Sequence, residues 1–262
     1  RPIGLGIQGL SDALIRMKIQ FDSDESVNFN KKFMEAIYKG GVKASVDIAE
    51  ERYNFIKSIK NYISENNLEI PEFYYESFKI DDKTINKIYH KFRISKYDLT
   101  NKYALGSYSS FEGSPASKGI LQFDMWETVP SDIDFWNNIK QRIKQNGMRN
   151  SLITALMPTA STSNIMGNTE CFEPYTNNIY TRKVLAGDFV IINKHMINDM
   201  IAIGEWNSDV KNFIIGDNGS IQKLSISNKF KELYKTMWEI KQIWVLKNAL
   251  ARSPYVDQSQ SM

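Results

Sequence analysis

The stretch Arg149–Arg182 constrains the fold of this chain more than any other part of the sequence. It opens on a largely apolar run, Ser151–Met157, which has the length of one buried β-strand and ends at Pro158. A short helical segment, Asn164–Met166, then closes at Gly167. Between strand and helix lie four hydroxyl side chains in five positions: Thr159, Ser161, Thr162 and Ser163. Because ligands of α/β folds bind at the carboxyl ends of strands, we expect this turn to be a binding site.

Two interpretations of the hydroxyl groups are open from their spacing. Ser161 or Thr162 could simply cap the N-terminus of the following helix, which is the usual role of such residues. Alternatively, the hydroxyl and backbone N–H groups bind one anion, assisted by the partial positive charge of a helix N-terminus.

Longer blocks of sequence carry a family resemblance. Met157–Thr162 (MPTAST), Asn168–Tyr175 (NTECFEPY) and Asn178–Arg182 (NIYTR) resemble the phosphate-binding loop and the following segment of the large subunit of class I ribonucleotide reductase. Further blocks resemble the same family in the same order: Arg1–Leu10, Phe111–Trp126, Arg149–Ser151, Trp238–Ile240 and Asp257–Ser261.

The resemblance implies an α/β fold, specifically the C-terminal half of a ten-stranded α/β barrel. The alternation of strand and helix signals along the chain agrees with the α/β class. We expect residues 1–262 to form a single segment of the catalytic barrel domain, with a mostly helical insertion over residues 53–107, where the chain departs from the common form of the family. Since the chain begins and ends inside motifs, we also expect it to be an internal segment of a longer polypeptide.

The family converts ribonucleoside diphosphates to 2'-deoxyribonucleoside diphosphates by thiyl-radical chemistry, and the resemblance implies the same activity for the parent protein. It implies these partners: a radical-generating, metal-containing small subunit, a second copy of the large subunit, and thioredoxin or glutaredoxin as reductant. ATP and deoxynucleoside triphosphates would bind as effectors outside this chain. For the segment itself it implies no catalytic residue, no metal and no cofactor. Five residues are expected to bind the substrate: Pro158, Thr159, Ala160, Ser161 and Thr162. Pro158 would flank the base or ribose, and the other four would bind the diphosphate.

Cys171 is the only cysteine, so an internal disulfide is excluded. The family chemistry needs one radical cysteine and two redox cysteines, and we therefore expect the segment to be inactive alone and Cys171 to be an ordinary cysteine. The Asn-x-Cys-x-Glu loop and a tyrosine pair would lie upstream and downstream of this chain. An alternative is a non-catalytic nucleotide-binding relic that acts through partner binding.

The pattern Gly4-x-Gly6-x-x-Gly9 matches the dinucleotide-binding fingerprint and suggests an NAD-binding oxidoreductase as a third hypothesis. It lacks a preceding strand, and the candidate second strand, Ile19–Phe21, is too short to support it. The resemblance instead implies a structural strand-to-helix element in which the glycines allow close backbone approach.

Composition narrows the class of protein. With 42% hydrophobic residues the 262-residue chain can bury a substantial core, and a net charge of +3 does not indicate a nucleic-acid-binding surface. No run approaches about 18 consecutive apolar residues and no signal peptide is evident, which predicts a soluble cytoplasmic protein without membrane contact. His90 and His195 lack partners at metal-ligand spacing, so we expect His90 to be a surface or hydrogen-bonded histidine and His195 to have a structural role.

Periodicity predicts the remaining elements. They are helices over 25–52, 53–65 and 83–94, a helix from 133 with Ile133, Trp136, Ile139 and Ile143 facing inward and Gly147 as its stop, a strand over 188–192, a helix from 195, a turn over 217–220, and a last long helix over 230–251 capped by Ser227 or Asn228.

Overall fold

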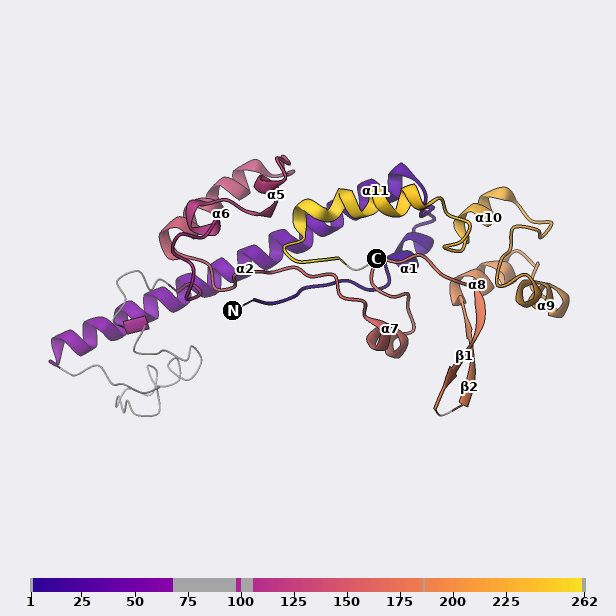
Figure 1. Ribbon diagram of the computed structural model, residues 1–262, viewed down its shortest axis with the longest axis horizontal. Coiled ribbons are helices and arrows are strands. Elements are labelled where there is room, and N and C mark those ends of the chain that lie inside the picture. Colours follow the sequence, from indigo (N-terminus) through magenta and orange to yellow (C-terminus); the bar gives the residue numbers. More distant parts are fainter. Residues whose placement is uncertain (1, 68–97, 100–105, 186, 261–262) are drawn as a thin grey trace. The chain divides into compact units, whose positions relative to one another are not determined.

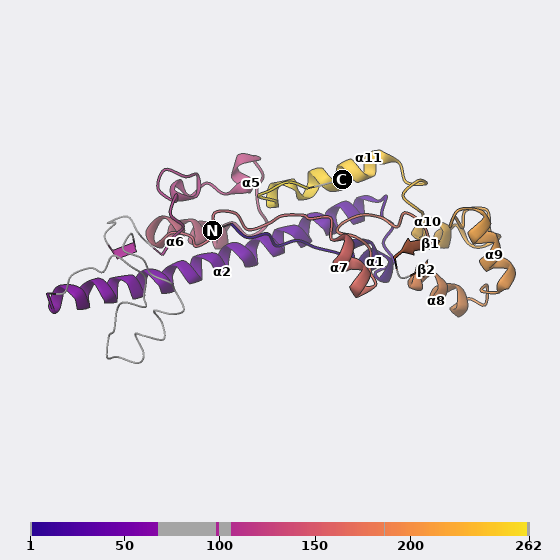
Figure 2. The same ribbon diagram turned by 60° about the horizontal axis from the view of Figure 1, so that its bottom comes forward.

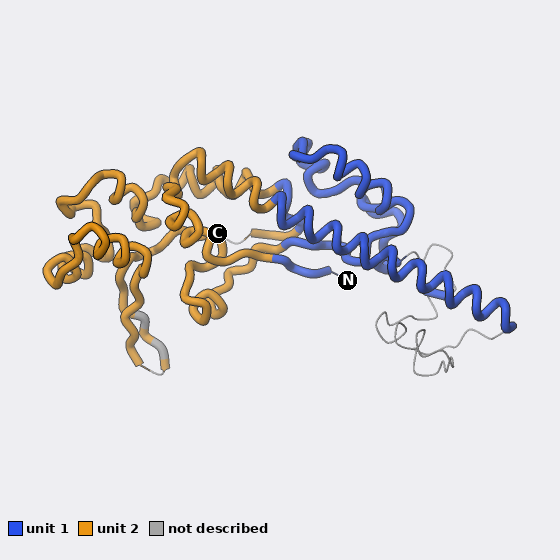
Figure 3. The backbone as a smooth tube through the Cα atoms, turned by 180° about the vertical axis from the view of Figure 1, so that it is seen from behind, with its two compact units in different colours: residues 1–5, 35–154, 254–257 blue, residues 6–34, 155–253, 258–262 orange. Residues whose placement is uncertain are grey.

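The computed structural model describes residues 2–67, 98–99, 106–185 and 187–260. The predicted helix over 83–94, with His90, lies outside the described residues. The chain divides into two compact units (Figure 3): unit 1 comprises residues 1–5, 35–154 and 254–257, and unit 2 comprises residues 6–34, 155–253 and 258–262.

The described elements are mostly helical (Figure 1). In chain order they are α1 (Leu10–Arg16), α2 (Asp24–Glu65), the 3₁₀ turn η2 (Ala116–Lys118), α5 (Gln122–Met125), α6 (Ile133–Asn146), α7 (Ala160–Met166), β1 (Ile179–Val184), β2 (Gly187–Ile192), α8 (Lys194–Ala202), α9 (Ser208–Gly216), α10 (Asn228–Leu233), α11 (Gln242–Arg252) and the 3₁₀ turn η3 (Ser253–Tyr255).

Helix α2 is one uninterrupted helix of 42 residues (Figure 2). The prediction of separate helices over 25–52 and 53–65 was therefore wrong, because neither a proline nor a glycine lies near residue 53 to stop the first one. The Gly40–Gly41 pair does not break the helix. A Cβ atom on Gly41 would lie 2.4 Å from Ile153 Cγ2, whereas one on Gly40 would meet nothing within 4 Å. Gly41 thus marks close packing on one side of α2.

Unit 1 is centred on buried aromatic side chains. The rings of Phe123 and Trp136 lie 4.8 Å apart, and the Tyr38 ring lies 5.8 Å from that of Trp136. Helix α6 confirms its prediction at both ends, since the Asp132 side chain accepts the Phe135 N–H at 3.1 Å and Gly147 is the C-cap. Ile133 is exposed, contrary to expectation, because it occupies the first turn of α6 rather than the packed middle.

The extended segment 151–157 does not form the predicted regular strand. It makes two isolated parallel bridges, Leu5 with Thr154 in unit 1 and Leu156 with Gln260 in unit 2. The Asp257 carboxylate accepts the backbone N–H groups of Ile153 and Thr154, at 2.7 and 3.2 Å, so a side chain takes donors that a continuous ladder would use.

Unit 2 packs α8, α9 and the first residue of β1 around a buried apolar cluster of Ile15, Ile179, Met196, Met200, Ile214, Ile221 and Tyr234. The strand predicted over 188–192 is confirmed as β2, which pairs antiparallel with β1. The predicted turn over 217–220 is also confirmed, with Asn218 and Gly219 both at positive φ.

The last long helix predicted over 230–251 is instead two helices, α10 and α11. Between them, Glu239 accepts the Thr236 N–H at 2.6 Å and Tyr175 O accepts the Met237 N–H at 2.8 Å. These bonds remove donors that a continuous helix would need. The Ser227 cap is confirmed by a 3.3 Å bond from Phe230 N to its hydroxyl oxygen.

Over the described part of the chain, none of the helices combines the length and the apolar character needed to cross a lipid bilayer.

Candidate functional site

The hydroxyl-rich residues begin α7 rather than precede it. Thr159 is the N-cap, and the Ser163 N–H donates to Thr159 O at 2.9 Å, which closes the first turn. Helix α7 therefore begins at Ala160, four residues before the predicted start at Asn164. The prediction that Ser161 or Thr162 caps the helix was therefore wrong, because both residues lie within its first turn. Gly167 ends α7 in the left-handed conformation, as expected, with φ 65°.

Thr159 has an unusual backbone and a specific side-chain contact. Its φ of 56° and ψ of 20° lie in the left-handed region, which is costly for a β-branched residue. Its hydroxyl does not cap α7 but accepts the backbone N–H of Cys171 at 2.8 Å. The contact ties the start of α7 to the segment that follows the helix.

The other predicted residues present their groups to solvent. Pro158, Ala160, Ser161 and Thr162 are exposed, and Thr159 is half-buried. The first-turn N–H groups of residues 160–162 have no acceptor within α7, as at any helix start. The Thr162 hydroxyl contacts two acceptors, Gln8 Oε1 at 2.9 Å and Thr159 O at 3.2 Å. The five residues are therefore together in one short turn with hydroxyl and N–H donors at its surface.

A buried carboxylate supports the segment after α7. Asp12 Oδ2 accepts the Thr169 N–H at 2.7 Å and the Thr169 hydroxyl at 2.9 Å. Its Oδ1 accepts the Tyr175 hydroxyl at 2.7 Å and lies 2.9 Å from His195 Nε2. Burial by itself raises the pKa of Asp12, but these hydrogen bonds, led by the one from Thr169 N, outweigh it and hold the pKa below its ordinary value. His195 thus has a partner that lies 183 residues away along the chain.

The side chains of Cys171 and Phe172 are also buried. Burial raises the pKa of the Cys171 thiol to about 11. The Arg252 guanidinium lies over the Phe172 ring, with 3.6 Å from Cζ to the ring centroid, and its Nε donates to Gln260 at 2.6 Å. Burial lowers the pKa of Arg252 to about 10. Residues 169–172 thus form a support for the turn, joined to it by the bond from Cys171 N to the Thr159 hydroxyl.

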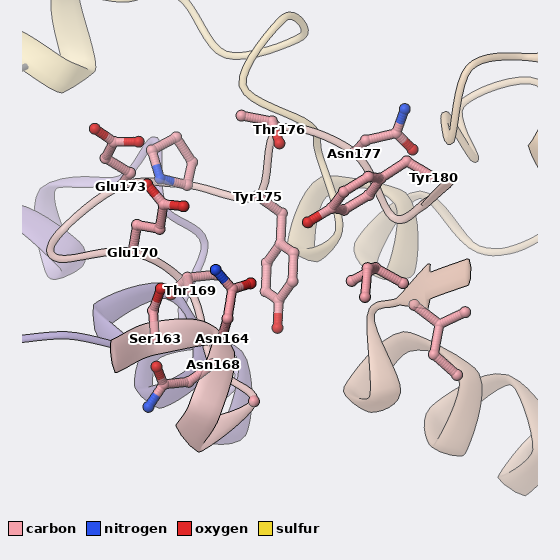
Figure 4. Close-up of a pocket in the computed structure, with 14 residues that line it drawn as sticks. Ser163, Asn164, Asn168, Thr169, Glu170, Glu173, Tyr175, Thr176, Asn177 and Tyr180 are labelled. Carbon is pink, nitrogen blue, oxygen red and sulfur yellow. The ribbon is translucent and has the colours of Figure 1, made fainter. Parts of the chain in front are cut away.

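A cavity of about 230 Å³ lies beside this support in unit 2 (Figure 4). The Tyr175 ring projects into its centre, and Glu170 and Glu173 lie on one side. Burial, with a smaller contribution from Glu170, raises the pKa of Glu173. Residues 158–162 do not line this cavity, and its two carboxylates make it unsuited to a phosphate group. Over the described residues no cluster of three or more metal-ligating side chains occurs.

Comparison with known proteins identifies the family of this chain. The family model described as "Ribonucleotide reductase, barrel domain" matches residues 1–262. The chain belongs to the ribonucleotide reductase family. It is 41% identical over 263 residues to the ribonucleoside-diphosphate reductase large subunit of Arabidopsis thaliana, covering 100% of this chain and 26% of the relative. It is 42% identical to the large subunit of Dictyostelium discoideum and 39% identical to that of vaccinia virus, with 24% and 27% of those relatives covered and all of this chain.

Among solved structures, the chain is similar to the Actinobacillus ureae class Id ribonucleotide reductase alpha subunit. The TM-score is 0.59 at 20% sequence identity, covering 100% of this chain and 32% of the other. The expected fold class, an α/β fold that is part of the ribonucleotide reductase barrel, is therefore confirmed. The chain spans about a quarter of the length of the curated relatives it matches.

Sequence reasoning missed Asp12 and Gln8, the two side chains that contact the turn and its support from the N-terminal part of the chain. Asp12 is 157 residues from Thr169 and Gln8 is 154 residues from Thr162, so no local pattern pairs them. The only local signal is the glycine pattern around Gln8, which resembles a dinucleotide motif. Gly6 has the close backbone approach expected of a structural element, since a Cβ there would lie 2.8 Å from Ala155 O.

Proposed function

We propose that this chain is the part of a ribonucleotide reductase catalytic subunit that anchors the diphosphate of a ribonucleoside diphosphate substrate. Thr159, Ala160, Ser161 and Thr162 bind the diphosphate through hydroxyl and backbone N–H groups, and Pro158 flanks the base or ribose. The observation that carries the proposal is the turn itself: exposed hydroxyl and N–H donors on a backbone that the Thr159–Cys171 bond holds in a strained conformation. Neutral donors select an anion by geometry, since they act without the strong field of a lysine.

The same proposal covers the whole protein. The whole protein reduces ribonucleoside diphosphates to 2'-deoxyribonucleoside diphosphates as a homodimer. It acts with a metal-containing, radical-generating small subunit, takes thioredoxin or glutaredoxin as its reductant, and binds nucleotide effectors. The radical and redox cysteines cannot all be among these residues, because the family chemistry needs three cysteines and Cys171 is the single one here. Residues 1–262 act as one segment of the barrel domain, and residues 53–107 are an insertion within it.

The test is reduction of cytidine diphosphate by the full-length protein with its small subunit. Ser161→Ala combined with Thr162→Ala is compared with wild type, and each lost hydroxyl is expected to cost about 1–3 kcal/mol of substrate binding. A matched control, Ser208→Ala with Ser225→Ala, removes two exposed hydroxyl groups outside the turn. We expect a sharply raised KM in the first double variant and a wild-type KM in the control.

Two results would contradict the proposal in different ways. An active wild type whose KM is unchanged by the Ser161 and Thr162 substitutions means that the site assignment is wrong. A wild type that is inactive with an intact small subunit favours the nucleotide-binding relic.

A further inference from the structure

Gln8 lies between two glycines that fix the backbone on either side of it. A Cβ on Gly6 would lie 2.8 Å from Ala155 O, so residue 6 runs directly against the backbone that leads into the turn. Gly9 has φ 75°, and its N–H donates to Thr169 O at 2.9 Å. These constraints, rather than a dinucleotide, account for the glycine pattern, and they place the Gln8 side chain against α7.

The contact between Gln8 and Thr162 joins two groups that can each change role. Thr162 has one hydroxyl proton and two acceptors within reach, Gln8 Oε1 at 2.9 Å and Thr159 O at 3.2 Å. A glutamine carboxamide has an acceptor oxygen and a donor nitrogen of nearly the same shape on one carbon. Rotation of the carboxamide by about 180° about its last torsion, which has broad minima, places the nitrogen where the oxygen was.

This hydrogen bond contributes little to folding. The contact is exposed to solvent, where both groups find water instead, and ordering a glutamine side chain has an entropic cost of about the same size as the net gain from one bond. The bond matters instead for the direction of the Thr162 hydroxyl, because that direction decides whether the hydroxyl can donate to an anion.

We propose that Gln8 is a positioning residue for the Thr162 hydroxyl in the substrate turn, an inference that rests on the proposed function. In the structure, Gln8 Oε1 accepts the Thr162 hydroxyl proton. When a diphosphate binds, the carboxamide turns over, its N–H₂ group donates to Thr162 Oγ1, and the hydroxyl proton goes to a phosphate oxygen. No covalent bond changes in this exchange.

A glutamate at this position could accept a hydrogen bond from the Thr162 hydroxyl but could not donate one to Thr162 Oγ1. It would also place a negative charge beside the bound diphosphate. The inference therefore predicts that Gln8→Glu impairs binding more than Gln8→Ala, although glutamate preserves the shape and the acceptor of the original side chain.

The experiment measures the Kd of cytidine diphosphate for the full-length protein by calorimetry. Gln8→Ala and Thr162→Val are each expected to weaken binding about fivefold, which is about 1 kcal/mol. The double variant is expected to bind no more weakly than Thr162→Val alone, because Gln8 acts only through that hydroxyl. Gln8→Glu is expected to weaken binding by more than about tenfold, and by less at high salt.

Gln222→Ala is the matched control, since the Gln222 side chain donates to Lys231 O at 3.0 Å and is not in contact with the turn; it should bind as wild type does. Gln8→Met keeps the length of the side chain without its hydrogen bond, and it replaces Gln8→Ala if that variant does not fold. Wild-type affinity in both Gln8→Ala and Gln8→Met overturns the inference, as does a double variant weakened about 25-fold by two independent effects. If Thr162→Val also binds as wild type, the proposed function of the turn falls with it. If Thr162→Val alone weakens binding, the turn assignment stands and only the role of Gln8 is lost.

Discussion

The strained conformation of Thr159 gives the sharpest prediction about the turn. A β-branched residue in the left-handed region costs about 1–2 kcal/mol relative to ordinary backbone. The contact that opposes this cost is the 2.8 Å hydrogen bond from Cys171 N to the Thr159 hydroxyl oxygen, and Cys171 is only 2% exposed. An amide buried this well has no water to replace a lost acceptor.

Three substitutions separate the strain from the hydrogen bond. Thr159→Val keeps the shape and the strain but leaves the Cys171 N–H unpaired, which costs about 1–3 kcal/mol. Thr159→Gly loses the same acceptor but relieves the strain, so it should be about 1 kcal/mol less harmful than valine. Thr159→Ser keeps the acceptor and should be the mildest of the three.

Native-state hydrogen exchange at the Cys171 amide of the full-length protein measures these differences as local opening free energies. The expected order of protection is wild type, serine, glycine and then valine. Equal protection in the serine and valine variants would show that the hydroxyl does not hold the amide. Faster exchange in the glycine variant than in the valine variant would show that the left-handed backbone stores no strain.

Three further predictions concern other parts of the chain. Gly40→Ala should stabilise α2 by about 0.5–1 kcal/mol, whereas Gly41→Ala should destabilise it by about 1–3 kcal/mol because its Cβ would lie 2.4 Å from Ile153 Cγ2. Hydrogen-exchange protection along α2 measures both effects. Equal effects of the two substitutions would contradict the packing argument. The lowered pKa of Asp12 means that its contribution to stability is complete above the unfolded value of about 3.9 and is lost as pH falls through the lower folded value. Asp12→Asn should therefore lower the free energy of unfolding by about 1–3 kcal/mol at neutral pH, with the difference from wild type shrinking below about pH 4; a pH-independent difference in denaturant titrations would refute this. Since burial raises the pKa of Cys171 to about 11, about one thiol in a thousand is ionised at about pH 8, and iodoacetamide should modify the native protein far more slowly than the denatured protein; equal rates would show an accessible thiol.

Local sequence signals predicted the elements whose ends are encoded locally. Helix α6 begins where Asp132 supplies a cap and ends where Gly147 has φ 82°, and both signals are legible in the sequence. The strand-like apolar run over 188–192 likewise corresponds to β2. The family assignment needed only ordered blocks of sequence, because each block preserves residue identities that a fold class alone does not require.

Tertiary contacts decided the elements whose hydrogen bonds go to distant residues. The apolar run 151–157 is not a regular strand because Asp257 takes two of its N–H groups, and the helical pattern over 230–251 is interrupted because Glu239 and Tyr175 take two others. Backbone groups form whichever hydrogen bonds the whole fold offers, so periodicity alone cannot locate such breaks.

The sequence by itself determined which residues gather at the turn, since Pro158 to Thr162 are consecutive and covalent connection holds them together. Only the tertiary structure decided how their groups point. The Thr159 hydroxyl is directed to Cys171 and the Thr162 hydroxyl to Gln8, across 12 and 154 residues of chain. A hydroxyl rotates freely until a partner fixes it, and here those partners are brought close only by folding.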